Sequence, residues 1–203
     1  MLLSNDHATT AAPLPVVPFP RVTDFDNACR VLAAALPGVE LVGDCPDAQS
    51  IGDWIGLERS DYVALDARVS GRHTTLLCVP YASWHSTDTM EVLTSLKELL
   101  SVLERRVVLV PEGFIRRQPR LGNAMLIAGS GHASLTSSDR MRVLAALIEE
   151  DSATLLELAS LVDSSDPVSS ILRLVCEGCL EIDLNRPILP TSLVRMARGM
   201  VAR

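Results

Sequence analysis

The 203-residue chain is poor in lysine, in aromatic residues and in long apolar runs. Aromatic residues make up only 3% of the chain, so aliphatic side chains have to fill the core. No apolar run approaches the roughly 20 residues that a membrane-spanning helix needs. The first ten residues also lack a basic segment followed by an apolar one, as a secretion signal would have. We therefore expect a soluble, cytoplasmic protein without a membrane partner.

Cysteine is present but forms no regular framework. Five cysteines, an odd number, indicate reduced and mostly buried thiols rather than disulfides. Cys176 and Cys179 form a CxxC pair, but no second pair of cysteines or histidines follows at a zinc-ligand spacing. This pair is therefore interpreted as part of a packed helix end.

The charge is acidic overall and unevenly distributed. A net charge of −7 argues against strong nonspecific DNA affinity for the protein as a whole. Residues 100–130, however, carry five arginines and two acids, whereas residues 137–190 carry four arginines and ten acids. Any basic surface is therefore local.

Hydrophobic periodicity predicts an α/β domain in the first two thirds of the chain. Residues 1–22 are rich in proline towards their end and indicate an extended arm. The pattern then predicts, in order, a helix, a strand, a hairpin, a long helix and a buried strand. We place these elements at 24–36, 39–45, 61–81, 88–106 and 106–114. Asp88 is predicted to cap the long helix. The apolar stripe of this helix consists of Met90, Leu93, Leu96, Leu99, Leu100 and Leu103. Residues 48–60 are ambiguous and receive no assignment.

A strand, helix and strand succession predicts a crossover connection and a parallel neighbour in a mixed sheet. The second strand of the hairpin, 74–81, is almost uniformly apolar, which predicts a central position in that sheet.

A glycine- and serine-rich linker at residues 129–139 precedes a second pattern. It predicts helices at 140–150 and 153–162, a third helix opened by Asp166-Pro167, and a small hairpin formed by LEIDL and PILP. A last basic helix is predicted over 191–203. Three helices and a hairpin are the outline of a winged helix, so we divide the chain into an arm at 1–22, an α/β domain at 23–129 and a winged-helix domain at 136–203.

The α/β element order is the core order of restriction-endonuclease-like nucleases. Together with the winged helix, it resembles the TnsA-type endonuclease subunit of heteromeric transposases over about residues 24–190. That resemblance implies a restriction-endonuclease-like mixed sheet, a strand aspartate that binds Mg²⁺, and a Q-x-K sequence on the next strand.

Carried over by position, Asp66 in YVALDAR matches the metal-binding aspartate and is the candidate catalytic and metal-ligating residue, in vestigial form. The Q-x-K sequence corresponds to Cys78-Val79-Pro80, so proline stands where the reaction needs a lysine. The only lysine, Lys97, lies in the middle of the predicted long helix. Asp66 could equally be an acid that faces solvent or bonds nearby backbone.

Four arginines are the candidate DNA-binding residues. Arg116, Arg117 and Arg120 follow the last strand of the α/β domain, where they either hold phosphates or form a solvated strand exit. Arg173 is the one basic residue on the helix that would read DNA in a winged helix. The acidity around it favours a protein-binding winged domain.

The leading hypothesis is a noncatalytic, nuclease-like adaptor in a DNA transaction, such as that of a mobile element, acting with another protein subunit. It requires no cofactor. One alternative is a Mg²⁺-dependent DNA endonuclease subunit that is completed by a partner or uses an arginine in place of lysine. The other alternative is a winged-helix transcriptional regulator. The apolar helix stripes also allow a homo-oligomer.

Overall fold

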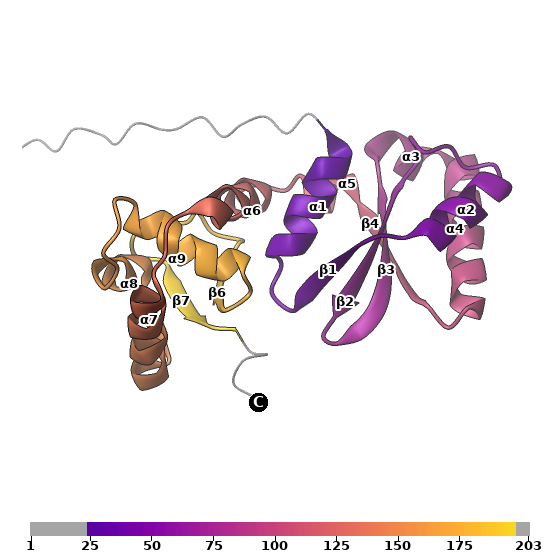
Figure 1. Cartoon of the computed structure of the whole chain (residues 1–203). Coiled ribbons are helices and arrows are strands. Elements are labelled where there is room, and N and C mark those ends of the chain that lie inside the picture. Colours follow the sequence, from indigo (N-terminus) through magenta and orange to yellow (C-terminus); the bar gives the residue numbers. More distant parts are fainter. Residues whose placement is uncertain (1–23, 198–203) are drawn as a thin grey trace, which may run out of the picture.

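Two sheets and the helices around them make up residues 24–197, the part of the chain that the computed structural model describes (Figure 1). The first sheet has the order β1-β2-β3-β4, with antiparallel pairing except between β3 and β4, which are parallel. Its strands are Val39–Asp44, Val63–Val69, Arg72–Val79 and Arg106–Pro111. The expected α/β fold with a mixed sheet is therefore confirmed.

The hairpin and the crossover around β3 set the order of this sheet. A two-residue turn joins β2 to β3, and both of its residues, Ser70 and Gly71, have positive φ angles of 51° and 78°, as tight hairpin turns require. After β3 the chain returns through a helix to the parallel strand β4. The predicted central position of the second hairpin strand is confirmed, since β3 pairs on both sides and Leu77 and Val79 are fully buried.

Helices cover both faces of the first sheet. Helix α1, Phe25–Ala35, has Asp24 as its N-cap, and the Asp24 side chain accepts a hydrogen bond from the amide of Asp26. It packs with Leu65 and Cys78 on one face of the sheet. Helices α2, Pro46–Trp54, and α4, Thr87–Val102, pack with Ala64 and Leu77 on the other face. Helix α2 falls in the stretch that received no assignment.

The long helix α4 differs from the prediction at its start and in its apolar stripe. Its cap is Ser86, whose hydroxyl accepts a hydrogen bond from the amide of Thr89, so the expected cap at Asp88 is wrong. A short helix, α3 at Tyr81–His85, occupies the polar segment before it. Of the expected stripe, Leu93, Leu96 and Leu100 are buried. Leu99 and Leu103, in contrast, are exposed, because Leu99 lies about 100° around the helix from the buried Leu100 and Leu103 follows the last helical residue.

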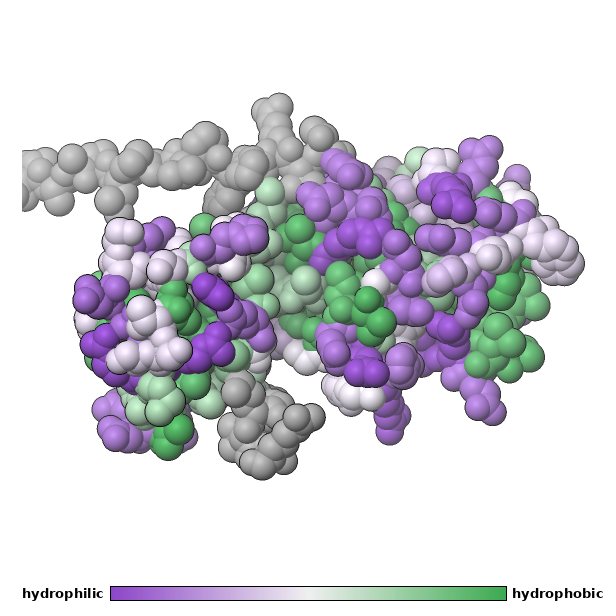
Figure 2. All heavy atoms as spheres, viewed as in Figure 1, coloured by the Kyte–Doolittle hydropathy of each residue, from purple (hydrophilic) through white to green (hydrophobic). Residues whose placement is uncertain are grey.

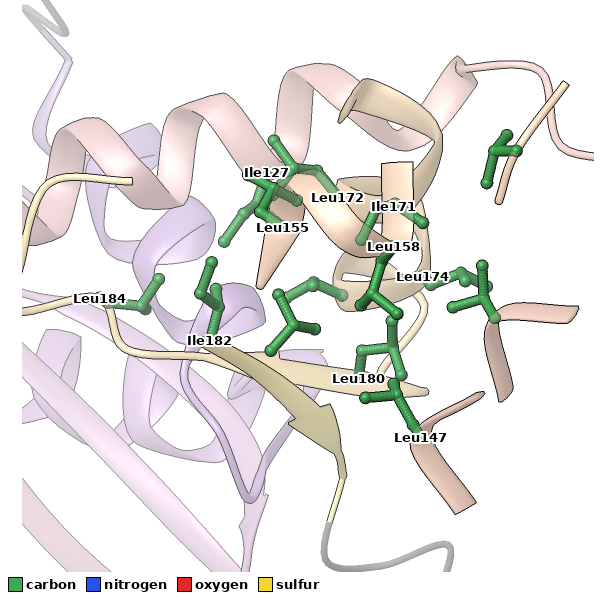
Figure 3. Packing of buried hydrophobic residues seen from close by; sticks show 14 residues of the cluster. Ile127, Leu147, Leu155, Leu158, Ile171, Leu172, Leu174, Leu180, Ile182 and Leu184 are labelled. Carbon is green, nitrogen blue, oxygen red and sulfur yellow. The ribbon is translucent and has the colours of Figure 1, made fainter. Parts of the chain in front are cut away.

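The second sheet belongs to the C-terminal part of the chain and has the order β5-β7-β6, all antiparallel. The elements follow as α7, β5, α8, α9, β6 and β7. Their bounds are Ser137–Glu150, Ser152–Thr154, Leu155–Ser160, Pro167–Cys176, Leu180–Ile182 and Leu193–Met196. Figure 3 shows side chains of α8, α9 and β6, such as Leu158, Ile171 and Leu180, pointing toward one another in the common core.

Two expectations about the end of the chain are wrong. The partner of β6 is Leu193–Met196 rather than PILP, which lies in the connection between the two strands. Consequently, residues 193–196 form a strand and not the start of a basic helix, because Val194 is needed in the core beside Ile182. Residues 198–203 and the predicted arm at 1–22 lie outside the described residues.

Helix α6 connects the two halves. It spans Arg120–Gly129 and follows the short helix α5, Glu112–Ile115. Leu121 and Ala124 of α6 pack in the core beside α1, whereas Ile127 packs in the core of the second half. The expected linker begins with a further helical turn, η1 at Ser130–His132, in which Ser130 is buried. Among residues 24–197, no helix is both long and apolar enough to span a bilayer.

Candidate functional site

Asp66 lies in the middle of β2, and two side chains from other elements bind its carboxylate. The hydroxyl of Thr75, directly opposite on β3, donates a hydrogen bond to Oδ1 at 3.0 Å. Nη1 of Arg105 donates to both carboxylate oxygens at 3.1 Å. The Asp66 side chain is only 19% exposed. The predicted metal ligand is therefore one partner in a largely shielded ion pair.

Arg105 reaches Asp66 from the turn between α4 and β4, and it contacts the start of α2 as well. Its Nη2 donates to Oδ2 of Asp47 at 2.6 Å, and Nη1 lies 3.7 Å from the sulfur of Cys45. The hydrogen bond to Asp66 is the main cause that raises the pKa of Arg105. A single guanidinium thus holds α2 and the α4–β4 turn against the sheet. Sequence reasoning missed this residue because 39 positions separate it from Asp66.

The structure does not bring Asp66, Cys78 and Pro80 together. Cys78 opposes Val63, whereas Asp66 opposes Thr75. Side chains alternate between the faces of a strand, so Cys78, three residues from Thr75, points to the opposite face. There it packs in the core with Cys29 of α1, and the hydrogen bond between the two thiols is the main cause that raises the pKa of Cys29. Pro80 is the N-cap residue of α3.

The arginines after β4 point to different surroundings. Arg116 forms an ion pair with Glu112, and its guanidinium lies 6.0 Å from the ring centre of Phe25. Arg117 is exposed. Arg120 is 9% exposed and lies over the ring of Phe114, 4.3 Å from its centre. Of the three, Arg117 is the side chain that the structure leaves most accessible to a phosphate.

Arg120 is also a link between the two halves of the chain. Its Nη2 and Nε donate to Oδ1 of Asn185 at 2.6 and 3.2 Å. One turn further along α6, the amide of Asn123 donates to the carbonyls of Leu184 and Arg186 at 2.9 and 2.7 Å. The polar face of α6 therefore holds the segment that follows β6. Neither Asn123 nor Asn185 has a sequence signal that would have indicated this role.

Arg173 is bonded within the second half, and the central turns of α9 are largely buried. Nη1 of Arg173 donates to the carbonyl of Ala133 at 2.7 Å, and Nε donates to Glu177 at 2.8 Å. Helix α9 packs against α6 and η1 as well as α8. As a result, its middle is buried, at Ser170, Ile171, Leu172, Leu174 and Val175. This helix presents little free surface on its central turns.

A second polar cluster lies at the carboxyl ends of β3 and β4. Strand β3 ends at Val79, directly before Pro80, and β4 ends with Val110-Pro111; Val79 pairs with Pro111. The carboxylate of Glu112 accepts a hydrogen bond from the amide of Tyr81 at 2.7 Å. Burial opposes the ionised form of Glu112, but this hydrogen bond and Arg116 outweigh it, so its pKa is lowered. The repeated Val-Pro is the sequence signal that could have indicated this cluster.

The neighbouring polar groups at this edge are also hydrogen-bonded. The hydroxyl of Ser83 donates to Asp61 at 3.2 Å, and the rings of Tyr81 and His85 are 4.2 Å apart. His73, at the start of β3, and His85, beyond its end, lie at opposite ends of the strand. Among residues 24–197, no group of three or more His, Cys, Asp and Glu side chains is placed to hold a metal ion.

An open cleft of about 1040 Å³ separates the first sheet from the second. It is lined by the end of α1, the edge strand β1, the end of α9 and the edge strand β6. Its charged side chains include two ion pairs, between Glu40 and Arg68 and between Glu181 and Arg195. The remaining charged residue of the lining, Glu177, pairs with Arg140 and Arg173, so the cleft has no dominant sign of charge.

Comparisons of the chain with protein-family models, with curated proteins and with solved structures found no match.

Proposed function

We propose that this protein is a noncatalytic adaptor in a DNA transaction, with a nuclease-like core, in which another protein subunit performs the chemistry. The observation that carries the proposal is the bonding of Asp66 to Arg105 and Thr75. A divalent cation at Asp66 would have to displace the guanidinium or share the carboxylate with it. Displacing the guanidinium breaks its ion pair with Asp66, and sharing the carboxylate places two cations that repel each other side by side. Both are therefore unfavourable.

Strand order and connectivity support the two fold assignments within this proposal. A helix, an antiparallel hairpin, a crossover helix and a parallel strand are the arrangement expected of a restriction-endonuclease-like core. In the second half, the order α7-β5-α8-α9-β6-β7 with a β5-β7-β6 sheet is that expected of a winged helix. On this interpretation, α9 occupies the position of the recognition helix.

The surroundings of α9 favour protein contacts over sequence-specific DNA reading. A recognition helix inserts exposed polar side chains into the major groove. Here α6 and η1 pack on the helix, and Arg173 is bonded to Ala133 and Glu177. DNA contact in the adaptor would instead be local and weak, through the exposed Arg117.

Cleavage assays on matched variants test the proposal. Asp66→Asn removes the charge that a nuclease would use for its metal, whereas Asp47→Asn removes the other acid bonded to Arg105. We expect the wild-type protein to leave plasmid and linear DNA intact with Mg²⁺ or Mn²⁺. Cleavage that Asp66→Asn abolishes and Asp47→Asn retains would overturn the adaptor assignment.

That outcome would favour a second candidate, an endonuclease in which Arg105 replaces the missing lysine. The specific observation behind it is that Nη1 of Arg105 lies 3.1 Å from both oxygens of Asp66. The candidate predicts Mn²⁺ binding that is lost in Asp66→Asn, which isothermal titration calorimetry measures directly.

A winged-helix regulator makes a different prediction. It requires sequence-specific DNA binding that weakens on changing Arg173 or the 87% exposed Arg186. For the adaptor, we expect electrophoretic shifts of mixed-sequence duplexes to be weak and insensitive to Arg186→Ala.

A further inference from the structure

Helix α7 carries apolar side chains on two opposite faces. Val143 and Leu147 are buried in the core of the second half. Met141 and Ile148, in contrast, are 70% and 72% exposed, and Ala145 between them is exposed as well. At about 100° per residue, these three outward residues fall within about 60° of one another around the helix axis. They form one continuous apolar stripe that the described part of the chain leaves uncovered.

The position of α7 makes this stripe accessible. The helix lies at the end of the molecule that is remote from the first sheet (Figure 1). Its inner face packs on β5 and β7. Figure 2 shows apolar residues scattered at the surface of this half among polar ones. Isolated exposed apolar residues are ordinary on proteins, but a stripe at helical spacing is typical of a helix–helix interface.

The charges beside the stripe indicate which partner fits it. Arg142 pairs with the buried Asp139 of its own helix, yet its side chain remains 51% exposed and flanks the stripe near the start of the helix. Glu149 is exposed near its end and lies on the same flank, seven residues further along. In an antiparallel pair of two such helices, the same flank of each copy faces that of the other, and the two helices run in opposite directions. Arg142 of each copy then faces Glu149 of the other.

We propose that α7 of a second copy of this chain covers the stripe, forming an antiparallel, two-fold symmetric homodimer. Two copies supply matching apolar stripes and two equivalent Arg142–Glu149 pairs across the axis. A parallel pair would instead set the basic start of one helix against the same basic start of the other. The inference does not depend on the proposed adaptor role.

The N-terminal arm is a poorer match for the same stripe. Residues 8–20 contain no charged side chain that could pair with Arg142 or Glu149. They also contain four prolines, which are incompatible with the interior of a paired helix. Residues 8–20 therefore do not supply the complement that a second α7 supplies.

The dimer is expected to depend on concentration, because a stripe of about two helical turns buries less area than a standard stable interface. Sedimentation-velocity measurements on the full-length chain, from low to high micromolar concentration, should show monomer converting to dimer. A wild-type protein that stays monomeric over this range would overturn the proposal.

Two exposed apolar residues provide a matched pair of variants. Ile148→Asp places one charge from each copy within the apolar stripe and should raise the dimer dissociation constant roughly a hundredfold. Leu156→Asp changes an equally superficial leucine of α8, 61% exposed, and should leave the dimer intact. Equal effects of the two variants, or no effect of Ile148→Asp, would contradict an interface on α7.

A second pair of variants tests the antiparallel orientation. Glu149→Arg creates two like-charged contacts with Arg142 and should raise the dissociation constant about tenfold. Glu150→Arg makes the same charge change at a residue that lies about 100° from Glu149 around the helix axis, and it should have little effect on the dissociation constant. Circular dichroism melts establish that the variants fold. A dimer that tolerates Glu149→Arg as well as Glu150→Arg would overturn the orientation.

Discussion

Arg120 and Asn185 are 65 residues apart in sequence, and the hydrogen bonds between them join the two halves of the protein. Nη2 of the arginine lies 2.6 Å from Oδ1 of the asparagine. The same guanidinium lies over the ring of Phe114 in the first half. The contact therefore couples the segment after β4 to the segment after β6.

Replacing Arg120 should destabilise the whole fold. Arg120→Ala leaves Oδ1 of Asn185 without its donor and removes the cation from the face of Phe114, which should cost about 2–4 kcal/mol. Urea unfolding followed by circular dichroism measures this change. The exposed neighbour is the control, and Arg117→Ala should stay within about 0.5 kcal/mol of wild type. Equal effects of the two substitutions would show that the Arg120–Asn185 contact contributes little.

Asp66 should behave as a structural residue. Asp66→Ala leaves Arg105 partly buried without its main counter-ion and should lower the free energy of unfolding by about 1–3 kcal/mol. Asp47→Ala, which removes the more exposed partner of Arg105, should cost less than about 1 kcal/mol. Both values should be the same with EDTA and with Mg²⁺. A wild-type melting temperature that rises with Mg²⁺, and does so only while Asp66 is present, would instead indicate a metal ligand.

Gly52 should resist enlargement because of its contact with Tyr62. A Cβ atom at Gly52 would lie 2.0 Å from the tyrosine hydroxyl, which donates to the carbonyl of Ala48 at 2.9 Å. We expect Gly52→Ala to destabilise the protein by about 1–3 kcal/mol through overpacking. In the background of Tyr62→Phe, which lacks the clashing oxygen, the same substitution should cost less. Thermal melts of the four proteins in this cycle provide the measurement.

The C-terminal half should lose stability in acid. The hydroxyl of Thr136 is the main cause that lowers the pKa of Asp139, with further help from Arg142 and the amide of Asp163. A carboxyl whose pKa is lowered by folding stabilises the native state above its unfolded pKa of about 4. That contribution to stability is lost as the pH falls through the lower pKa that the carboxyl has in the folded protein. Asp166 acts in the same direction, because its hydrogen bonding with Ser169 lowers its pKa.

Melting temperatures recorded from neutral pH down to acid pH measure this loss. Asp139→Asn should flatten the profile below about pH 4, since the variant has no carboxyl to protonate at this position. The exposed Glu150→Gln is the matched control and should leave the profile as in wild type. Parallel profiles for wild type and Asp139→Asn would contradict the assignment to Asp139.

The first sheet could be predicted from sequence because its signals are local. The turn at Ser70-Gly71, the apolar run of β3 and the periodic leucines of α4 each lie within one short segment. Helix α2 could not be predicted in this way, since its last turn holds Gly52, whose presence is explained only by the contact with Tyr62. Strand β7 was predicted as helix because TSLVRMAR contains neither a turn signal nor a strong alternation of apolar and polar residues. It forms a strand because it pairs with β5 and β6, and these contacts are distant in sequence.

The candidate site was less predictable than the fold. Sequence spacing indicated that Asp66 lies on a strand, but its partner Arg105 comes from a distant turn. The separation of Asp66 from Cys78 follows from hairpin register, and the two-residue turn fixes that register. Arg116 and Arg120 are only four residues apart, yet Arg116 pairs with Glu112 of α5 whereas Arg120 bonds Asn185 in the other half of the chain.

Helix α6 contributes Leu121 to one hydrophobic core and Ile127 to the other. Local opening of either core therefore has to disturb a helix that the other core needs, which makes the two halves thermodynamically dependent on each other. Heat or denaturant should unfold residues 24–197 in one cooperative transition, with no intermediate in which a single half persists. By the same linkage, a molecule that binds one half should slow amide hydrogen exchange in the other.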